Sequence, residues 1–110
     1  MPIANCVVSA NCPQGQGDLI ELWSRSAQQS TEHMTINLIR GEQQGQDYAV
    51  VATLFLPSVW SSLAMKRLQE GLAVALTEYF TIKPSDVIVL TQVLESGQVV
   101  EDAETVYWGA

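Results

Sequence analysis

Residues 48–94, YAVVATLFLPSVWSSLAMKRLQEGLAVALTEYFTIKPSDVIVLTQVL, place an apolar run, a long helical pattern and a second apolar run in that order. Tyr48–Leu56 is nearly continuous in apolar residues, which is typical of a strand buried on both faces. A proline ends this run, and Ser58 can cap a helix predicted from about Val59 to Phe80. Asp86–Leu94 predicts another strand. The stretch is therefore typical of a βαβ unit, whose crossover helix lets its two strands run parallel.

The first half of the chain repeats this plan. Ile3–Ser9 predicts a strand, Asp18 caps a helix predicted from about Leu19 to Gln29, and Met34–Arg40 predicts a second strand. Two such units joined by a polar turn form a four-stranded mixed sheet with both helices on one face. We predict one α/β domain over residues 1–110, with βαβ repeats at about 2–41 and 47–94 and a C-terminal tail at 95–110, in which Gln98–Val100 begins a short return strand.

The other face of this sheet is rich in apolar residues and has no third helix to cover it. Other copies of the chain are the simplest cover, so the pattern favours a homo-oligomer. The same order of strands and helices also fits a ferredoxin-like domain. That alternative predicts antiparallel pairing and typically a dimer.

Composition excludes several classes of protein. Five Lys and Arg residues against 12 Asp and Glu give a net charge of −7, which argues against nucleic acid, because phosphate binding needs a basic surface. The sequence contains neither a signal-peptide pattern nor an apolar run long enough to span a membrane, so we expect a cytoplasmic protein without membrane association. Cys6 and Cys12 are interpreted as free thiols. We expect neither a metal nor a cofactor.

Pro2 raises a functional question, because it heads the first predicted strand and follows the initiator methionine directly. Proline is tolerated at the first position of a strand, which is the purely structural interpretation. Loss of Met1 would instead leave Pro2 with a secondary amine at the amino terminus. An α-amino group has an ordinary pKa of about 7.7–8.0, and burial lowers this pKa. Such an amine can therefore act as a base near neutral pH.

Pro2 at the head of a strand, the duplicated βαβ plan and the chain length together resemble the tautomerase superfamily. The likeness is to macrophage migration inhibitory factor-like members, with the 4-oxalocrotonate tautomerase group as a half-length relative. The passage YFTIKPSDV at residues 79–87 is similar to the family's entry into the fourth strand. The resemblance implies a homotrimer, with Pro2 as the catalytic base of a tautomerase or isomerase acting on a small enol or keto acid.

The sequence departs from the family around the expected substrate. The stretch SANCPQG at residues 9–15 contains no positive charge, and Ile88 and Leu90 stand where relatives similar to migration inhibitory factor have tyrosine and asparagine. These departures favour an alternative function, a non-catalytic oligomeric binding module on the same scaffold.

Four further residues are candidates for substrate binding. His33 stands at a helix-to-strand junction, where a solvated side chain is the simpler interpretation. Arg40 can hold a carboxylate, although an edge charge is the simpler role. Tyr107 and Trp108 are adjacent aromatics near the end of the chain. They either cover their own sheet or reach a neighbouring subunit, where they would form the wall of a pocket.

Overall fold

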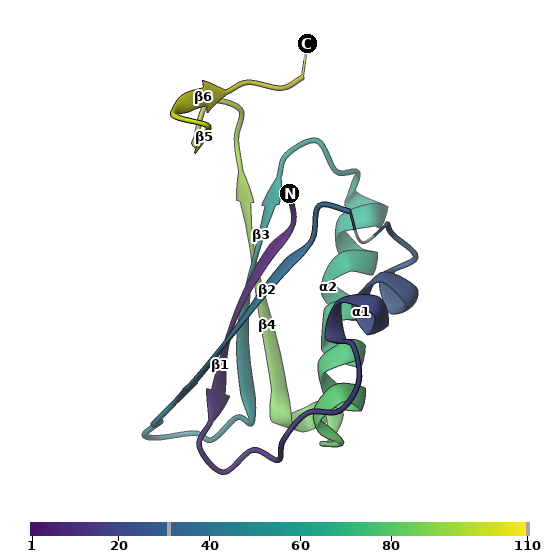
Figure 1. Ribbon diagram of the computed structural model, residues 1–110, viewed down its shortest axis with the longest axis vertical. Helices are drawn as coiled ribbons and strands as arrows, with labels where there is room; N and C mark the ends of the chain where they lie inside the picture. The colour runs from purple at the N-terminus through teal and green to yellow at the C-terminus, as the bar shows by residue number, and fades with distance from the viewer. Residues whose placement is uncertain (31, 110) are drawn as a thin grey trace.

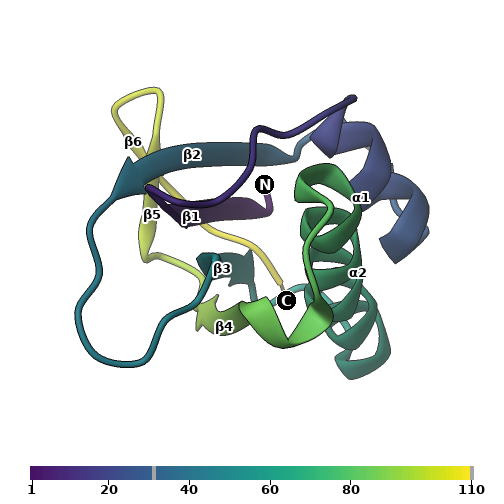
Figure 2. The same ribbon diagram turned by 90° about the horizontal axis from the view of Figure 1, so that it is seen from below.

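The computed structural model describes residues 1–30 and 32–109. It has the predicted α/β architecture, with both helices packed on one face of the sheet (Figures 1 and 2). The sheet comprises β1 (Ile3–Ser9), β2 (Thr35–Gly41), β3 (Val50–Pro57) and β4 (Val87–Leu94), the helices are α1 (Leu19–Ala27) and α2 (Ser62–Phe80), and a 3-10 turn, η1, spans Pro84–Asp86.

Strand pairing confirms the two βαβ units. The spatial order is β2-β1-β3-β4. β1 pairs with β2 in parallel, β3 pairs with β4 in parallel, and the two units meet through the antiparallel pair β1–β3. The two parallel pairs rule out the ferredoxin-like alternative, which requires antiparallel pairing throughout.

The register brings particular strand ends together. Ile3 lies opposite Thr35 on one side and opposite Phe55 on the other. The starts of β1 and β2 therefore share one end of the sheet with the ends of β3 and β4. We call this the Pro2 end, and the opposite end the far end.

The core lies between the sheet and the helices. Alternate residues of β1 and β3 are buried against the helices, among them Ala4, Cys6 and Leu54. The two helices are in close contact: the indole Nε1 of Trp23 donates a hydrogen bond to the carbonyl of Leu68 at 2.9 Å.

Both helices differ from the sequence-based boundaries at one end. α1 ends at Ala27, before the predicted Gln29, because Gln28 adopts the left-handed conformation with φ 58°. α2 is capped by Ser61, whose hydroxyl accepts a hydrogen bond from the backbone N–H of Ala64 at 3.1 Å. The prediction that Ser58 caps this helix is wrong, because Ser58 extends the β3–β4 pairing through a bond from its N–H to the carbonyl of Leu94 at 2.9 Å.

The tail also differs from its prediction. β5 (Val99–Glu101) does not return to the main sheet and instead pairs with β6 (Glu104–Val106). The intervening Asp102 and Ala103 both have positive φ, at 58° and 61°, as two-residue hairpin turns require. This hairpin projects beyond the sheet (Figure 1), and the radius of gyration of 14.4 Å exceeds the roughly 13 Å typical of this chain length.

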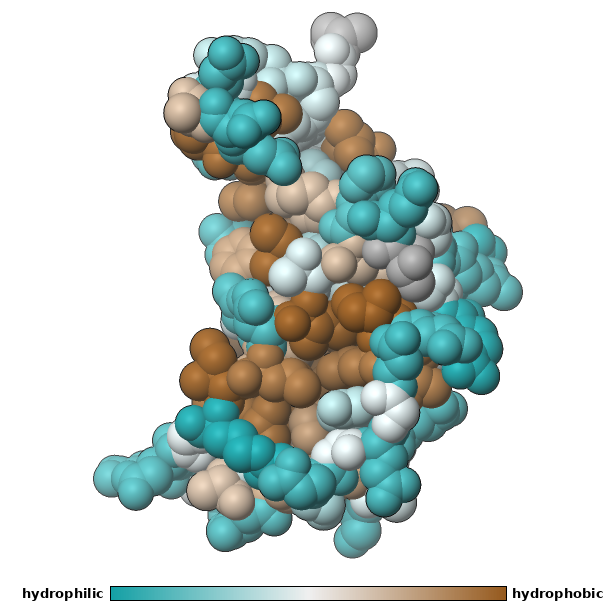
Figure 3. Space-filling model, in the orientation of Figure 1, coloured by the Kyte–Doolittle hydropathy of each residue, from teal (hydrophilic) through white to brown (hydrophobic). Residues whose placement is uncertain are grey.

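The face of the sheet away from the helices leaves apolar side chains in contact with solvent. Val7 on β1, Ile39 on β2 and Leu90 on β4 point away from the core and are 38%, 57% and 52% exposed. In the orientation of Figure 1 the helices lie to the right of the sheet, so Figure 3 views the sheet from its edge and shows hydrophobic side chains gathered across the middle of the molecule. Within the described residues, no helix combines the length and the apolar character that crossing a membrane would require.

Candidate functional site

Pro2 is buried immediately before β1. Its carbonyl accepts a hydrogen bond from the backbone N–H of Thr35 at 3.0 Å, which extends the β1–β2 pairing to this residue. Extending the β1–β3 register by one residue places Pro2 opposite Leu56, which is also buried. The carbonyl of Pro2 is therefore held by β2, which fixes the backbone at the start of β1.

The amino terminus beside Pro2 is partly shielded from water. Burial lowers the pKa of the Met1 amine from its ordinary value of 8.0, and the carboxylate of Glu101 opposes this shift by raising the pKa. Burial is the larger effect. In the chain that retains Met1, this burial favours the neutral form of the Met1 amine.

His33 and Arg40 lie at opposite ends of the sheet. His33 precedes β2 at the Pro2 end, where its side chain is 79% exposed and stands 4.0 Å from the carboxylate of Glu32. Arg40 lies at the far end, and its guanidinium donates hydrogen bonds to the carbonyls of Ser9 at 3.3 Å, Cys12 at 2.8 Å and Pro13 at 3.1 Å. Within one chain, Arg40 therefore stabilises the loop after β1. It lies at the opposite end of the sheet from Pro2.

Tyr107 and Trp108 follow the hairpin and differ in exposure. Tyr107 is 76% exposed, whereas Trp108 is half-buried. The backbone N–H of Trp108 donates to the hydroxyl of Ser96 at 2.8 Å, and its indole Nε1 donates to the hydroxyl of Ser58 at 2.9 Å. Trp108 thus contacts its own chain, next to the end of β3.

The structure therefore brings Pro2, His33 and Trp108 to one end of the sheet and leaves Arg40 at the other. Sequence reasoning missed Ser58 and Glu101 at this end. Ser58 was predicted to cap a helix, and no role was predicted for Glu101. No local pattern marks either residue, because the groups they meet are distant in sequence.

The two cysteines are free, as predicted, and both are buried. Burial raises the pKa of the Cys6 thiol to about 12. Burial also raises the pKa of the Cys12 thiol, with Arg40 lowering it and Asp86 raising it to smaller extents. Neither thiol is ionised near neutral pH, which argues against a nucleophilic role. Among the described residues, no three His, Cys, Asp or Glu side chains cluster in a way that could hold a metal ion.

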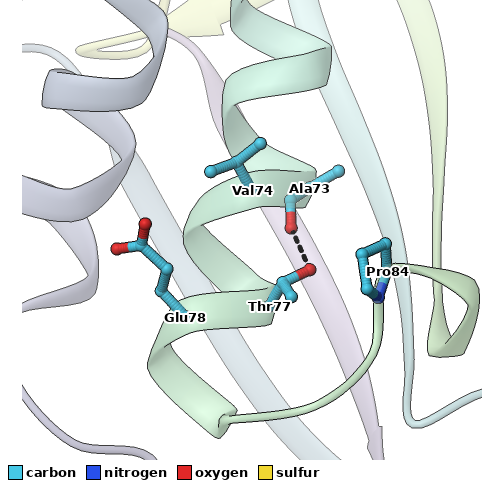
Figure 4. Close-up of a pocket in the computed structure, with 5 residues that line it drawn as sticks. All are labelled: Ala73, Val74, Thr77, Glu78 and Pro84. Carbon is cyan, nitrogen blue, oxygen red and sulfur yellow. Dashed lines mark hydrogen bonds between the residues drawn. The ribbon is translucent and has the colours of Figure 1, made fainter.

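A hollow of about 300 Å³ lies beside α2 near its carboxyl end, where Ala73, Val74, Thr77, Glu78 and Pro84 line it (Figure 4). It was not predicted from the sequence. The Thr77 hydroxyl donates to the carbonyl of Ala73 at 2.8 Å, so its proton is already engaged. The walls are mostly apolar, and the hollow lies near the far end of the sheet, away from Pro2.

No protein-family model and no curated protein sequence matches the chain. Solved structures do match. A wild-type fused 4-OT, described as an asymmetric trimer, aligns with a TM-score of 0.73 at 13% identity, covering 94% of each chain. Macrophage migration inhibitory factor from Oncomelania hupensis aligns with a TM-score of 0.68 at 12% identity, covering 96% of this chain and 83% of that one. A member of the cis-3-chloroacrylic acid dehalogenase family aligns with a TM-score of 0.63 at 10% identity, covering 94% and 82%.

The chain is therefore similar in fold to these proteins over nearly its whole length. The resemblance to the tautomerase superfamily inferred from its sequence is confirmed at the level of the fold. At these identities, the likeness concerns the arrangement of strands and helices, and the reaction must be argued from the site.

Proposed function

We propose that this protein is a tautomerase or isomerase that uses the amine of Pro2, after removal of Met1, as a proton-transferring base on a small enol or keto acid. The observation that carries this proposal is Pro2 itself. It is buried and held by Thr35 at the Pro2 end, next to the Met1 amine, whose pKa burial lowers. Fold similarity to structures such as the fused 4-OT adds to this observation.

The proposed reaction needs no co-reactant. The neutral amine takes the proton of the enol hydroxyl. An oxygen electron pair then forms the carbonyl bond, while the electron pair of the C=C bond moves onto the carbon that does not carry the oxygen. The protonated amine then returns a proton to that carbon. The enol becomes the keto form, and the amine ends the cycle neutral. A base whose pKa lies near the working pH suits both halves of this transfer.

We expect the reaction to be slow. His33 is exposed to solvent, and the guanidinium of Arg40 is bonded to three loop carbonyls at the far end. Within one chain, neither side chain lies where it could stabilise an enolate that develops beside Pro2. Loss of one such stabilising group commonly lowers a rate by about 10²–10³.

Assembly is the second part of the proposal. The exposed apolar residues of the sheet favour burial against other copies of the chain, and three of the similar fused 4-OT structures are described as trimers. We therefore propose a homotrimer. Sedimentation equilibrium at micromolar concentration should give three times the chain mass. A monomer would contradict the proposal, and a dimer would contradict the number of subunits.

The catalytic proposal is tested with untagged protein whose intact mass shows that Met1 is absent. Conversion of phenylenolpyruvate to its keto form is followed by absorbance. We expect turnover above the buffer rate, with a marked loss in Pro2→Ala and in a form that retains Met1. Equal rates in all three proteins would contradict the proposal.

The alternative of a non-catalytic binding module is favoured by one observation. The guanidinium of Arg40 donates its hydrogen bonds to carbonyls of its own chain. This residue, which could otherwise bind a substrate carboxylate, therefore has a structural role. Equal rates in the test above, together with an intact oligomer, would support this alternative.

A further inference from the structure

We infer that the outer face of the sheet is the surface through which copies of this chain associate, and that a row of polar side chains across its middle aligns them. The outer face is the one turned away from α1 and α2 (Figure 2). The inference rests on the homotrimer of the proposed function, and it adds the residues that determine how the subunits are aligned.

Strand register arranges the outward side chains in rows that cross all four strands. The row toward the far end is entirely apolar: Ile39, Val7, Val51 and Ile88. The row toward the Pro2 end is mixed: Thr35, Ile3, Phe55 and Gln92. Between them lies a row that begins with three polar side chains and ends with an apolar one: Asn37, Asn5, Thr53 and Leu90. We call the first three of these residues the polar row.

These rows contain no charge. Within the described strands, none of the outward side chains in the three rows is Lys, Arg, His, Asp or Glu, although the chain has five Lys and Arg and 12 Asp and Glu residues. Depletion of charge marks the core of an interface. Because the net charge of −7 makes copies of the chain repel one another, the repulsion is least where they meet on a surface that adds no charge. A second copy therefore suits this face, whereas a partner bound through charge would find no counter-charge here.

The polar row is a specific feature of an otherwise apolar surface. The side-chain Nδ2 of Asn37 donates a hydrogen bond to Oδ1 of Asn5 at 2.7 Å, and Thr53 lies opposite Asn5 on β3. This bond uses one N–H of Asn37 and one lone pair of Asn5, so each amide retains donors and acceptors for a further partner. Burial of these groups against apolar side chains would leave them without partners, which costs free energy.

A second copy supplies matching groups. Amides are self-complementary, because each carries both donors and an acceptor. In a cyclic homotrimer every residue recurs at one height along the symmetry axis. Copies that meet through the outer face, with their strands along this axis, therefore bring their polar rows together and bury exposed apolar residues such as Ile39 and Leu90. A shift by one row, about 7 Å along a strand, would place the amides against apolar residues.

The polar row thus selects one alignment among several that apolar contact alone would allow. A buried asparagine has this role in coiled coils, where it specifies the register and the number of chains at some cost in stability. Replacement of the row by apolar side chains should therefore preserve association but remove its uniqueness.

The test uses full-length protein and three variants. Asn37→Asp places a carboxylate in the polar row, and Asn37 is exposed in one chain, so the charge itself does not disturb the fold. Asn11→Asp is the matched control, because it adds the same charge at an exposed position in the loop after β1. Asn5→Val combined with Asn37→Val makes the row apolar, and valine favours strands. Sedimentation equilibrium gives the concentration of half-dissociation, native mass spectrometry gives the subunit numbers, and circular dichroism checks the fold.

We expect Asn37→Asp to raise the concentration of half-dissociation by at least about 10-fold near neutral pH, because carboxylates of neighbouring copies repel one another where no counter-charge lies. Asn11→Asp should change this concentration by less than about 2-fold. The double valine variant should associate at least as strongly as the parent and show more than one subunit number, whereas the parent shows one.

The outcomes separate this inference from the proposed function. A trimeric parent whose association is insensitive to Asn37→Asp would refute the interface and uphold the homotrimer. A double valine variant with the single subunit number of the parent would refute the aligning role of the polar row. A dimeric parent that Asn37→Asp dissociates would uphold the interface and refute the number of subunits. A monomeric parent would overturn the inference and the homotrimer together, while turnover and its loss in Pro2→Ala would still decide the tautomerase.

Discussion

Replacing Gly71 by alanine should push the two helices apart. A Cβ at this position on α2 would lie 2.7 Å from the backbone nitrogen of Ala27 and 2.8 Å from its Cα. Ordinary contact begins near 3.4 Å, so the backbones must separate by about 0.7 Å. Because the obstructing atoms belong to the backbone of α1, rotation of a side chain cannot relieve the clash.

The magnitude follows from three effects. Alanine in place of glycine favours the helix by about 1 kcal/mol. Overpacking against an unyielding neighbour costs up to about 3 kcal/mol. Separation of the helices also weakens the bond from Trp23 to Leu68, worth about 1 kcal/mol. The free energy of unfolding should therefore fall by about 2–3 kcal/mol, and Tm by roughly 10 °C.

The assay is urea and thermal denaturation at one fixed protein concentration, because assembly would contribute to the apparent stability. Glu70→Ala is the matched control, an exposed neighbour on α2 that should change stability by less than about 0.5 kcal/mol. A Gly71→Ala protein as stable as the parent or more stable would refute the close packing of the helices. The helix propensity of alanine would then outweigh any clash between its Cβ and the backbone of Ala27.

Two further predictions concern pH and the loop after β1. The pKa of the Cys6 thiol is raised by burial from 9.0 to about 12, so the unfolded chain loses this proton at lower pH than the folded chain. The free energy of unfolding should fall between pH 9 and 12 with a slope of up to about 1.4 kcal/mol per pH unit. Denaturation curves measured over this range should show that the free energy of unfolding of Cys6→Ala depends less steeply on pH. An identical pH dependence in the two proteins would contradict the role of the Cys6 thiol. Arg40→Lys should lower stability by about 1 kcal/mol and speed amide exchange in the loop at residues 10–12, because an ammonium cannot reproduce the fork that reaches three carbonyls. Arg25→Lys is the control, since its paired Glu21 lies 3.9 Å away on an exposed surface. Equal exchange rates in the two variants would count against the bracing role of Arg40.

The sequence by itself determined the order of the strands and helices. The apolar runs of β1 and β3 and the helical spacing of α2 are local periodic patterns, and short-range physics decides whether they become strand or helix. Pro2 could likewise be chosen from sequence, because its position after Met1 and at the start of a strand is a property of the chain order. The boundaries were less certain: Ser58 resembles a helix cap as closely as Ser61 does, and tertiary contact decided between them.

Only the tertiary structure decided which groups meet at each end of the sheet. The sequence is compatible with both parallel and antiparallel pairing of the strands, and β1–β2 and β3–β4 pairing resolved this choice. Arg40 bonds to carbonyls 27–31 residues away, and Trp108 bonds to a serine 50 residues away. Such contacts depend on strand register and on the path of the tail. Neither leaves a local trace in the sequence, because hydrogen bonds between distant segments form wherever the fold brings a donor to an acceptor.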